Sequence, residues 1–125
     1  MNDTMDLVHR APVTVEPTET VLAAAQKMTA NHLGALLVVE DGKLTGMFTE
    51  RDVLDRVVSR GLDPKVTPVA EVATAHPIAV KAETPVALCY QLIKQHGFRH
   101  LPVIAEDGSP RGVLSVRDFL AAAVA

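Results

Sequence analysis

The chain has 125 residues, of which 48% are hydrophobic, enough for one globular domain whose core needs no disulfides. Its 12 basic and 15 acidic residues leave a net charge of -3, which argues against nucleic acid as the main partner, because nucleic-acid binders usually carry a basic face. The single cysteine, the polar and acidic residues 1–6 and the lack of an apolar run of about 18 residues predict a cytoplasmic protein without a disulfide, signal peptide or membrane span.

The first predicted elements are a short extended segment at residues 12–15 and the helix that follows it. Thr18 is expected to cap this helix, and Glu19 is an acidic first-turn residue that favours its start. Apolar residues recur at the spacing of one helix face: Val21, Ala25 and Met28. The pattern predicts a helix with one side packed on a core.

Two strands and a second helix are predicted next. The aliphatic run at residues 36–39 indicates a strand covered on both faces, and Asp41-Gly42 indicates a hairpin turn into a strand at residues 44–48. A closing helix is expected to begin after Thr49. Its predicted apolar stripe consists of Val53, Leu54, Val57 and Val58.

The second half of the chain repeats the first. Residue n matches residue n+65 from Pro12 through Val39 and residue n+66 afterwards, because one residue is inserted near Ala105. The motif Gly46-x-x-Thr49-x-Arg51-Asp52 thereby returns as Gly112-x-x-Ser115-x-Arg117-Asp118. Such a duplication is one supersecondary unit used twice.

The second copy begins after a linker at residues 59–65 and a predicted short helix at residues 67–74, whose counterpart is a segment near residues 3–9. Thr84 is expected to cap the second copy's long helix, with Pro85 at its first position. Cys89 and Tyr90 belong to this helix, and the cysteine falls on its apolar side, where it acts as a small hydrophobic residue.

Together these elements predict an α/β (α+β) protein of two β-α-β-β-α repeats related by a pseudo-twofold axis. The first repeat, with the N-terminal segment and the linker, covers residues 1–65, and the second covers residues 66–125. We expect the two repeats to form one globular module. Its apolar end, residues 119–125, is expected to dock on the core or on a partner.

Two hydroxyl-x-x-Asp motifs lie where a strand turns into a helix: Thr49 with Asp52, and Ser115 with Asp118. One interpretation is a capping box, in which the hydroxyl bonds an orphan amide and the acid complements the helix dipole. The other is a ribonucleotide site, because helix-terminal amides and a hydroxyl attract phosphate, while an ionised Asp accepts two hydrogen bonds from a ribose. Capping explains either copy alone, but less well the recurrence of the whole pattern.

These motifs and the segment Gly97-Phe98-Arg99-His100-Leu101-Pro102-Val103 resemble a tandem CBS-domain pair, the Bateman module, over residues 7–120. The resemblance implies a module, often dimeric, that binds adenosine compounds such as AMP, ADP, ATP or S-adenosylmethionine in clefts between its repeats. It implies that Asp52 and Asp118 hold the ribose and that Thr49 and Ser115 face phosphate. The base and phosphate regions are then lined by Thr14, Val15, Gly34, Ala35, Ile78, Val80, Arg99 and His100.

The two implied sites differ in sequence. Arg99-His100 in the second copy stands where the first has Gly34-Ala35. Arg99 is the best fixed cation for a phosphate, because guanidinium offers a planar fork of donors, although an exposed loop charge is the alternative. Arg51 and Arg117 are expected to form solvent-facing salt bridges.

Metal binding and catalysis are not predicted. His96 and His100 are four residues apart, but Gly97 is expected to end the helix between them, and no further ligand is near in sequence. Ser115 lacks any recognisable base or oxyanion donor. The sequence therefore predicts a protein that is not an enzyme and carries no metal or covalent cofactor.

The favoured hypothesis is a ligand-sensing regulatory module, whose expected partners are a second copy of the chain and a regulated protein of unknown identity. A dimerisation or scaffold module with vestigial clefts is the alternative from another class. A nucleic-acid-binding regulator is a third, against which the acidic balance argues.

Overall fold

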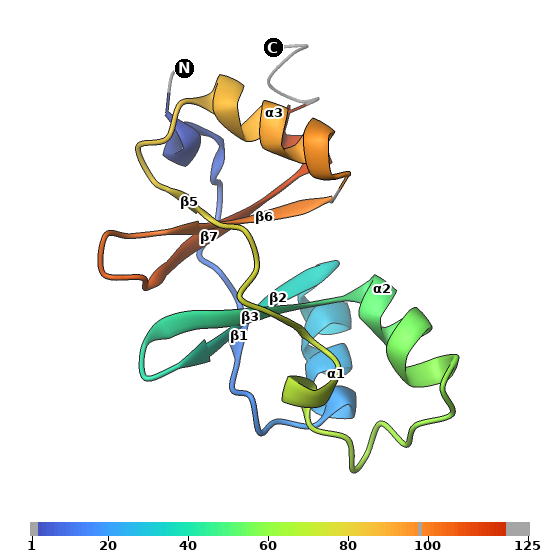
Figure 1. Ribbon diagram of the computed structural model, residues 1–125. Coiled ribbons are helices and arrows are strands. Elements are labelled where there is room, and N and C mark those ends of the chain that lie inside the picture. The colour runs from blue at the N-terminus through green and yellow to red at the C-terminus, as the bar shows by residue number, and fades with distance from the viewer. Residues whose placement is uncertain (1–2, 98, 120–125) are drawn as a thin grey trace. The chain divides into compact units, whose positions relative to one another are not determined.

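The computed structural model describes residues 3–97 and 99–119, which fall into two compact units (Figure 1). The repeat-1 unit contains residues 13–77. The repeat-2 unit combines the residues up to Pro12 with those from Ile78 onward. Each unit is built around its own sheet and its own hydrophobic cluster.

The repeat-1 unit has a mixed sheet in which β1 runs parallel to β2, and β2, β3 and β4 follow in antiparallel order. Its strands are β1 (Thr14–Val15), β2 (Ala35–Glu40), β3 (Lys43–Thr49) and β4 (Thr74–Ala75). Its helices are α1 (Val21–Asn31), α2 (Glu50–Asp52), the π-helical η2 (Val53–Val58) and the 3-10 helix η3 (Val69–Glu71).

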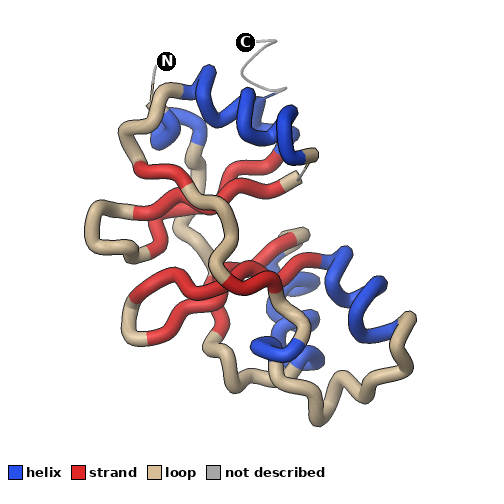
Figure 2. Tube along the Cα trace, viewed as in Figure 1, coloured by secondary structure: helices blue, strands red, loops and turns tan. Residues whose placement is uncertain are grey.

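The repeat-2 unit has the corresponding mixed sheet, with β5 parallel to β6 and β6 antiparallel to β7. Its strands are β5 (Val80–Lys81), β6 (His100–Ile104) and β7 (Pro110–Ser115). Its helices are the 3-10 helix η1 (Thr4–Leu7), α3 (Val86–His96) and a helical stretch at residues 116–119. The long helix of each unit, α1 or α3, lies against its own sheet (Figure 2).

The predicted β-α-β-β-α order is thus present in both units, and the predicted fold class is confirmed. The central strands β2 and β6 are the most buried elements, because they carry the continuous aliphatic runs of the sequence. The first hairpin also forms as predicted, since Asp41 and Gly42 have φ values of 53° and 77°, as a type I′ turn requires. The second hairpin has a longer loop, residues 105–109, which accommodates the inserted residue.

The predicted helix caps were wrong by one or two residues. Thr20, not Thr18, caps α1, and its hydroxyl oxygen accepts from the Ala23 amide at 3.1 Å. Pro85 occupies the cap position of α3, where no side-chain cap bond forms, so Thr84 does not play the predicted part. Helix boundaries drawn from local sequence patterns commonly differ from the observed ones by one or two residues.

The apolar stripe predicted for the closing helix of the first repeat was half wrong. Val57 is buried, but Leu54 and Val58 are 55% and 65% exposed. The helix changes from α to π geometry after Asp52, with backbone bonds from Ser59 N–H to the Leu54 carbonyl and from Leu62 N–H to the Val57 carbonyl. The spacing of side chains around the axis therefore departs from the period of 3.6 on which the prediction relied.

The short 3-10 helices are exchanged between the repeats. In the repeat-1 unit, the amide of Val69, in η3, donates to the Glu19 carbonyl at 2.8 Å. In the repeat-2 unit, the amide of Thr4, in η1, donates to the Thr84 carbonyl at 2.9 Å. The two bonds correspond, because Thr4 lies 65 positions before Val69 and Thr84 lies 65 positions after Glu19. The helix before the first repeat, η1, therefore packs on the second repeat, and the helix before the second repeat, η3, packs on the first. This exchange explains why the N-terminal residues belong to the repeat-2 unit.

The repeated glycines of the motif make room for the segments that follow these exchanged helices. A Cβ on Gly46 would lie 3.0 Å from the Thr74 carbonyl oxygen, and a Cβ on Gly112 would lie 2.5 Å from Val8 Cγ1. Thr74 belongs to β4 after η3, and Val8 directly follows η1. The recurrence of this glycine thus has a packing cause that is independent of any ligand.

Candidate functional site

The first motif lies at the junction of β3 and α2, beside the start of β2. Thr49 is the last residue of β3 and pairs with Ala35, and the amide of Glu50 donates to the Gly34 carbonyl at 3.0 Å. The structure therefore brings together Gly34, Ala35 and Thr49, each of which the resemblance implies to be a ligand-site residue. The sheet register fixes this arrangement.

Asp52 closes a capping box with Thr49. Its Oδ2 accepts from the Thr49 amide at 2.9 Å and from the Thr49 hydroxyl at 3.1 Å, and the same hydroxyl oxygen accepts from the Asp52 amide at 3.3 Å. The residue is only 6% exposed. On its other side, Oδ1 lies 3.7 Å from Arg56 Nε, and Arg56 Nη1 also donates to the Val72 carbonyl at 3.1 Å.

The second motif has the same local geometry in the repeat-2 unit. Asp118 Oδ2 accepts from the Ser115 amide at 2.7 Å and from its hydroxyl at 3.3 Å. Ser115 pairs with His100 across β6 and β7, and the amide of Val116 donates to the Arg99 carbonyl at 3.2 Å. Asp118 is half-buried, and among residues 3–97 and 99–119 it forms no ion pair.

The residues of the first strands are placed unequally. Val15 and Val80 are buried, at 2% and 6% exposure, and belong to the hydrophobic clusters of their units. Their side chains therefore serve the core, which leaves their backbone groups for any ligand contact. Ile78 is 43% exposed, and Thr14 is half-buried with its carbonyl accepting from Lys27 Nζ at 2.9 Å.

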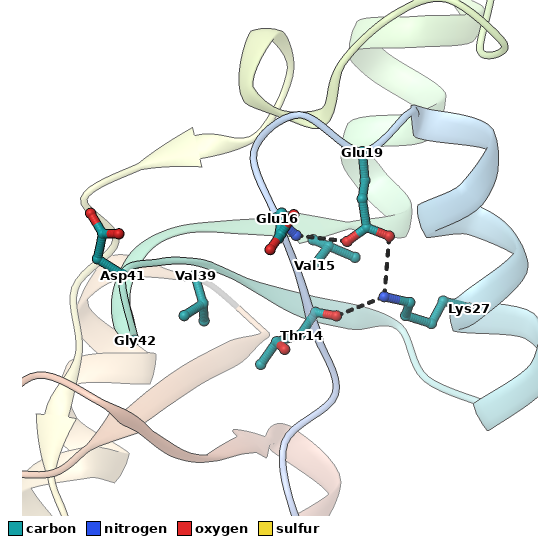
Figure 3. Close-up of a pocket in the computed structure, with 8 residues that line it drawn as sticks. All are labelled: Thr14, Val15, Glu16, Glu19, Lys27, Val39, Asp41 and Gly42. Atoms are coloured by element: carbon teal, nitrogen blue, oxygen red, sulfur yellow. Dashed lines mark hydrogen bonds and ion pairs between the residues drawn. The ribbon is translucent and has the colours of Figure 1, made fainter.

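A hollow of about 370 Å³ lies at the other end of the repeat-1 sheet, beside the hairpin tip (Figure 3). Lys27 reaches across it to Glu19, with 3.3 Å between Nζ and Oε1. The remaining charged residues of its lining, Glu16 and Asp41, are acidic. An ammonium group that is already paired and a surplus of carboxylates disfavour a phosphate here, so this hollow does not compete with the motifs as a nucleotide site.

Of the salt bridges predicted for Arg51 and Arg117, only that of Arg51 is found among the described residues. Arg51 forms an exposed pair with Asp55, with 3.9 Å between Nη1 and Oδ2, and the Arg99 and Arg117 side chains are exposed. Arg56 is the residue that the sequence analysis missed. Its spacing of four from Asp52 is the signal that could have revealed it, because side chains at i and i+4 are neighbours on a helix.

No metal-binding cluster of His, Cys, Asp or Glu occurs among the described residues. His96 ends α3 and His100 begins β6, and Gly97 between them adopts a left-handed conformation that stops the helix. Cys89 is buried, and this desolvation raises the pKa of its thiol, although a hydrogen bond with the Thr4 hydroxyl at 2.9 Å acts in the opposite direction.

Within residues 3–97 and 99–119, no helix has the length and apolarity that a membrane span requires. The cytoplasmic location stays a prediction. Of the apolar end of the chain, Phe119 is 9% exposed within the core of its unit, and its ring centroid lies 6.2 Å from that of Tyr90. The rest of the predicted docking segment, residues 120–125, lies outside the described residues.

Profiles of known protein families match this chain in two places. The CBS domain profile covers residues 5–59 and again residues 69–125. The chain belongs to the CBS-domain family. The tandem CBS pair expected from the repeated motifs is thereby confirmed. Both matched segments are CBS domains.

Similar CBS proteins cover nearly the whole chain. The CBS domain-containing protein YhcV from Bacillus subtilis is 34% identical over 95% of this chain and 84% of its own length. A solved CBS domain, NE2398, has a TM-score of 0.90 at 34% identity, with 98% of each chain covered. The CBS domain protein PAE2072 from Pyrobaculum aerophilum, solved in complex with AMP, has a TM-score of 0.87 at 29% identity, covering 98% of this chain and 99% of that one.

Other relatives are longer. The chain spans 20% of the length of a CBS domain-containing protein from Arabidopsis thaliana and 63% of the length of an uncharacterized protein from Acidianus ambivalens. A CBS pair thus occurs in this family both as most of a chain and as a smaller part of one.

Proposed function

We propose that this CBS pair is a regulatory module that binds an adenosine-containing metabolite, such as AMP, ADP, ATP or S-adenosylmethionine, and signals its occupancy to a partner protein. The proposal is carried by the paired motifs, each of which holds a carboxylate against the end of a strand and the start of a helix. The AMP complex of a relative with the same fold supports the choice of ligand class.

The ribose is the group that these carboxylates suit. An ionised carboxylate is an acceptor only, and the two adjacent hydroxyls of a ribose can both donate to it. The motif acids Asp52 and Asp118 are the two candidates for the ribose acceptor, and Thr49 and Ser115 are the hydroxyls beside them that could face the phosphate. Arg99, whose side chain is exposed beside the second motif, is the proposed phosphate cation, with His100 next to it.

Signalling requires more than binding. A ligand alters a partner only if it binds one arrangement of the module more tightly than another. We propose a homodimer as the signalling form, supported by the exposed apolar side chains of Leu54 and Val58 on η2. The regulated partner would then sense a change in the dimer.

The proposal is tested by thermal unfolding with and without AMP, ADP, ATP, NAD and S-adenosylmethionine. A ligand at 100 times its dissociation constant stabilises a protein by about 2.7 kcal/mol, so at least one compound should raise the melting temperature. The double variant Asp52→Ala/Asp118→Ala should lose this response, whereas the control Asp55→Ala, an exposed acid on the same stretch of helix, should keep it.

Three results would contradict the proposal in different ways. If no adenosine compound stabilises the wild type, the scaffold alternative with vestigial clefts is favoured. If the double variant still responds, the motif acids are not the ligand acceptors. Binding of DNA or RNA at physiological salt, seen as a retarded band, would favour the nucleic-acid alternative.

A further inference from the structure

The two motif acids share a cap but differ in what remains of their carboxylates. In the first motif, one oxygen of Asp52 is taken by the Thr49 amide and hydroxyl, and the other faces Arg56 Nε at 3.7 Å. The side chain of Asp52 is only 9% exposed. Both oxygens of this carboxylate are therefore engaged within the unit.

Arg56 is itself held from a second side. Its Nη1 donates to the Val72 carbonyl at 3.1 Å, so the guanidinium bridges the motif helix and the residue that follows η3. A guanidinium with two fixed partners loses less freedom on forming each further contact than a free side chain does. At 3.7 Å the Arg56 contact is an ion pair and not a hydrogen bond, and a ribose that bound Asp52 Oδ1 would compete with this cation for a buried carboxylate.

At the second motif, the part of the chain that the structure describes provides no such cation. Oδ2 of Asp118 accepts both cap bonds, at 2.7 and 3.3 Å, and Oδ1 has no hydrogen-bond or ion-pair partner among the described residues. The offset of 66 that relates the motifs places Ala122 where the first repeat has Arg56. Alanine carries no charge in any conformation, so the sequence itself rules out the same pairing.

The neighbouring positions differ in the same sense. The second repeat carries Arg99 beside its motif, and the first repeat carries Gly34 at the matching position. The repeat-2 unit thus combines the Asp118 carboxylate, one oxygen of which has no partner among the described residues, with the exposed Arg99. The repeat-1 unit has the paired carboxylate of Asp52 and no arginine at the position that matches Arg99. This combination suits a nucleotide in the repeat-2 unit, because ribose hydroxyls need a hydrogen-bond acceptor such as a carboxylate and a phosphate needs a cation.

We infer that the adenosine ligand is held by the second motif alone, with Asp118 as its ribose acceptor, while Arg56 keeps Asp52 as a purely structural acid. This inference rests on the proposed function and narrows it to one ligand per chain. Arg56 acts as a positioning residue, because it controls a carboxylate and touches no ligand itself.

The inference is tested by isothermal titration of AMP into the whole chain and four single variants. Wild type should bind one AMP per chain. Asp118→Ala should weaken binding by about tenfold or more, as the loss of a hydrogen bond to a charged group predicts. Asp52→Ala, which loses the matching cap, should bind one AMP with an affinity within about threefold of wild type, because it removes no ligand contact.

Arg56→Ala tests directly whether the Arg56 guanidinium keeps a ligand from Asp52. It should allow a second AMP to bind, because Asp52 Oδ1 becomes free, and its control Arg51→Ala, which removes an exposed arginine from the same helix, should not. Circular dichroism checks that each variant is folded. If Asp118→Ala does not fold, Asp118→Asn is used in its place. This substitution removes the negative charge, and its amide oxygen can still accept the cap bond.

The outcomes separate the two proposals. Two AMP molecules per wild-type chain, or a loss of binding in Asp52→Ala but not in Asp118→Ala, would overturn the inference and leave the proposed function in place. A single AMP that stays single in Arg56→Ala would overturn the part assigned to Arg56. No binding of AMP or of the other adenosine compounds by any variant would overturn the proposed function together with the inference.

Discussion

The first and second motifs carry the same residues in the same spacing, yet they differ in the groups around their acids. Asp52 and Asp118 accept matching bonds from the amide and the hydroxyl of Thr49 and Ser115, with lengths that agree within 0.2 Å. The difference comes from the residue four positions after the acid in the sequence, Arg56 in the first repeat and Ala122 in the second. A duplicated motif can therefore keep its folding role in both copies while only one copy keeps a carboxylate that is free to bind.

The comparison also separates two causes of recurrence that look alike in a sequence. Gly46 and Gly112 recur because the segment after each exchanged 3-10 helix approaches the sheet too closely for a side chain. Asp52 and Asp118 recur because each accepts the cap bonds of its helix. Neither recurrence by itself requires a ligand, so the choice between the two copies as the nucleotide site rests on what they do not share.

The largest expected effect concerns the glycines. Gly46→Ala and Gly112→Ala should each lower the free energy of unfolding by about 1–3 kcal/mol, as overpacking usually does. The obstacles differ, since Gly46 faces a backbone oxygen and Gly112 faces the Val8 side chain. The second change Val8→Ala should therefore rescue Gly112→Ala, whereas Gly46→Ala has no such remedy. Urea denaturation measures this, and equal costs for Gly112→Ala with and without Val8→Ala would contradict the packing explanation.

A smaller effect should distinguish the two caps. Thr49→Ala and Ser115→Ala each remove a capping hydroxyl, for which about 1 kcal/mol is typical. Thr49→Ala should cost more, because its hydroxyl both donates to Asp52 and accepts from the Asp52 amide, and because Asp52 is buried. The same denaturation experiment compares them, with Thr18→Ala, an exposed residue that caps nothing, as the control. A larger cost for Ser115→Ala would mean that the second cap carries more of the folding than its geometry indicates.

These caps show how far the sequence could predict the site. The type I′ hairpin at Asp41-Gly42 and the two hydroxyl-x-x-Asp caps follow from local chemistry, and both were predicted. The pairing of Arg56 with Asp52 depends on a helix that passes into π geometry and on the Val72 carbonyl, which only the folded chain supplies. The local sequence pattern therefore located the two acids but could not show which of them is paired with an arginine.

The exchange of the 3-10 helices η1 and η3 could not be predicted from the sequence either. An offset of 65 residues places residues 3–9 opposite residues 68–74, although few residues are alike between these two segments. The sequence does not show on which repeat each segment packs, because both repeats offer equivalent carbonyls, those of Glu19 and Thr84. Topology alone decides this, and it places the N-terminal segment in the repeat-2 unit.

The smallest expected effect is a dependence on pH that belongs to one unit only. Cys89 and its counterpart Ala24 are both fully buried, but only the thiol titrates. Because burial raises the pKa of Cys89 above its usual value, the unfolded chain loses this proton first, and stability falls as the pH rises through about 9 and beyond. Cys89→Ala should remove this part of the decline. Thermal unfolding between pH 7 and about 10 measures it, and a decline of equal size in wild type and variant would contradict the assignment to Cys89.

The inequality of the two motifs is tested most directly by a crystal structure of the chain grown with AMP. The account predicts one nucleotide per chain, with its ribose hydroxyls on Asp118 and with Arg56 still on Asp52. A nucleotide whose ribose lies on Asp52, with the Arg56 guanidinium displaced, would contradict it.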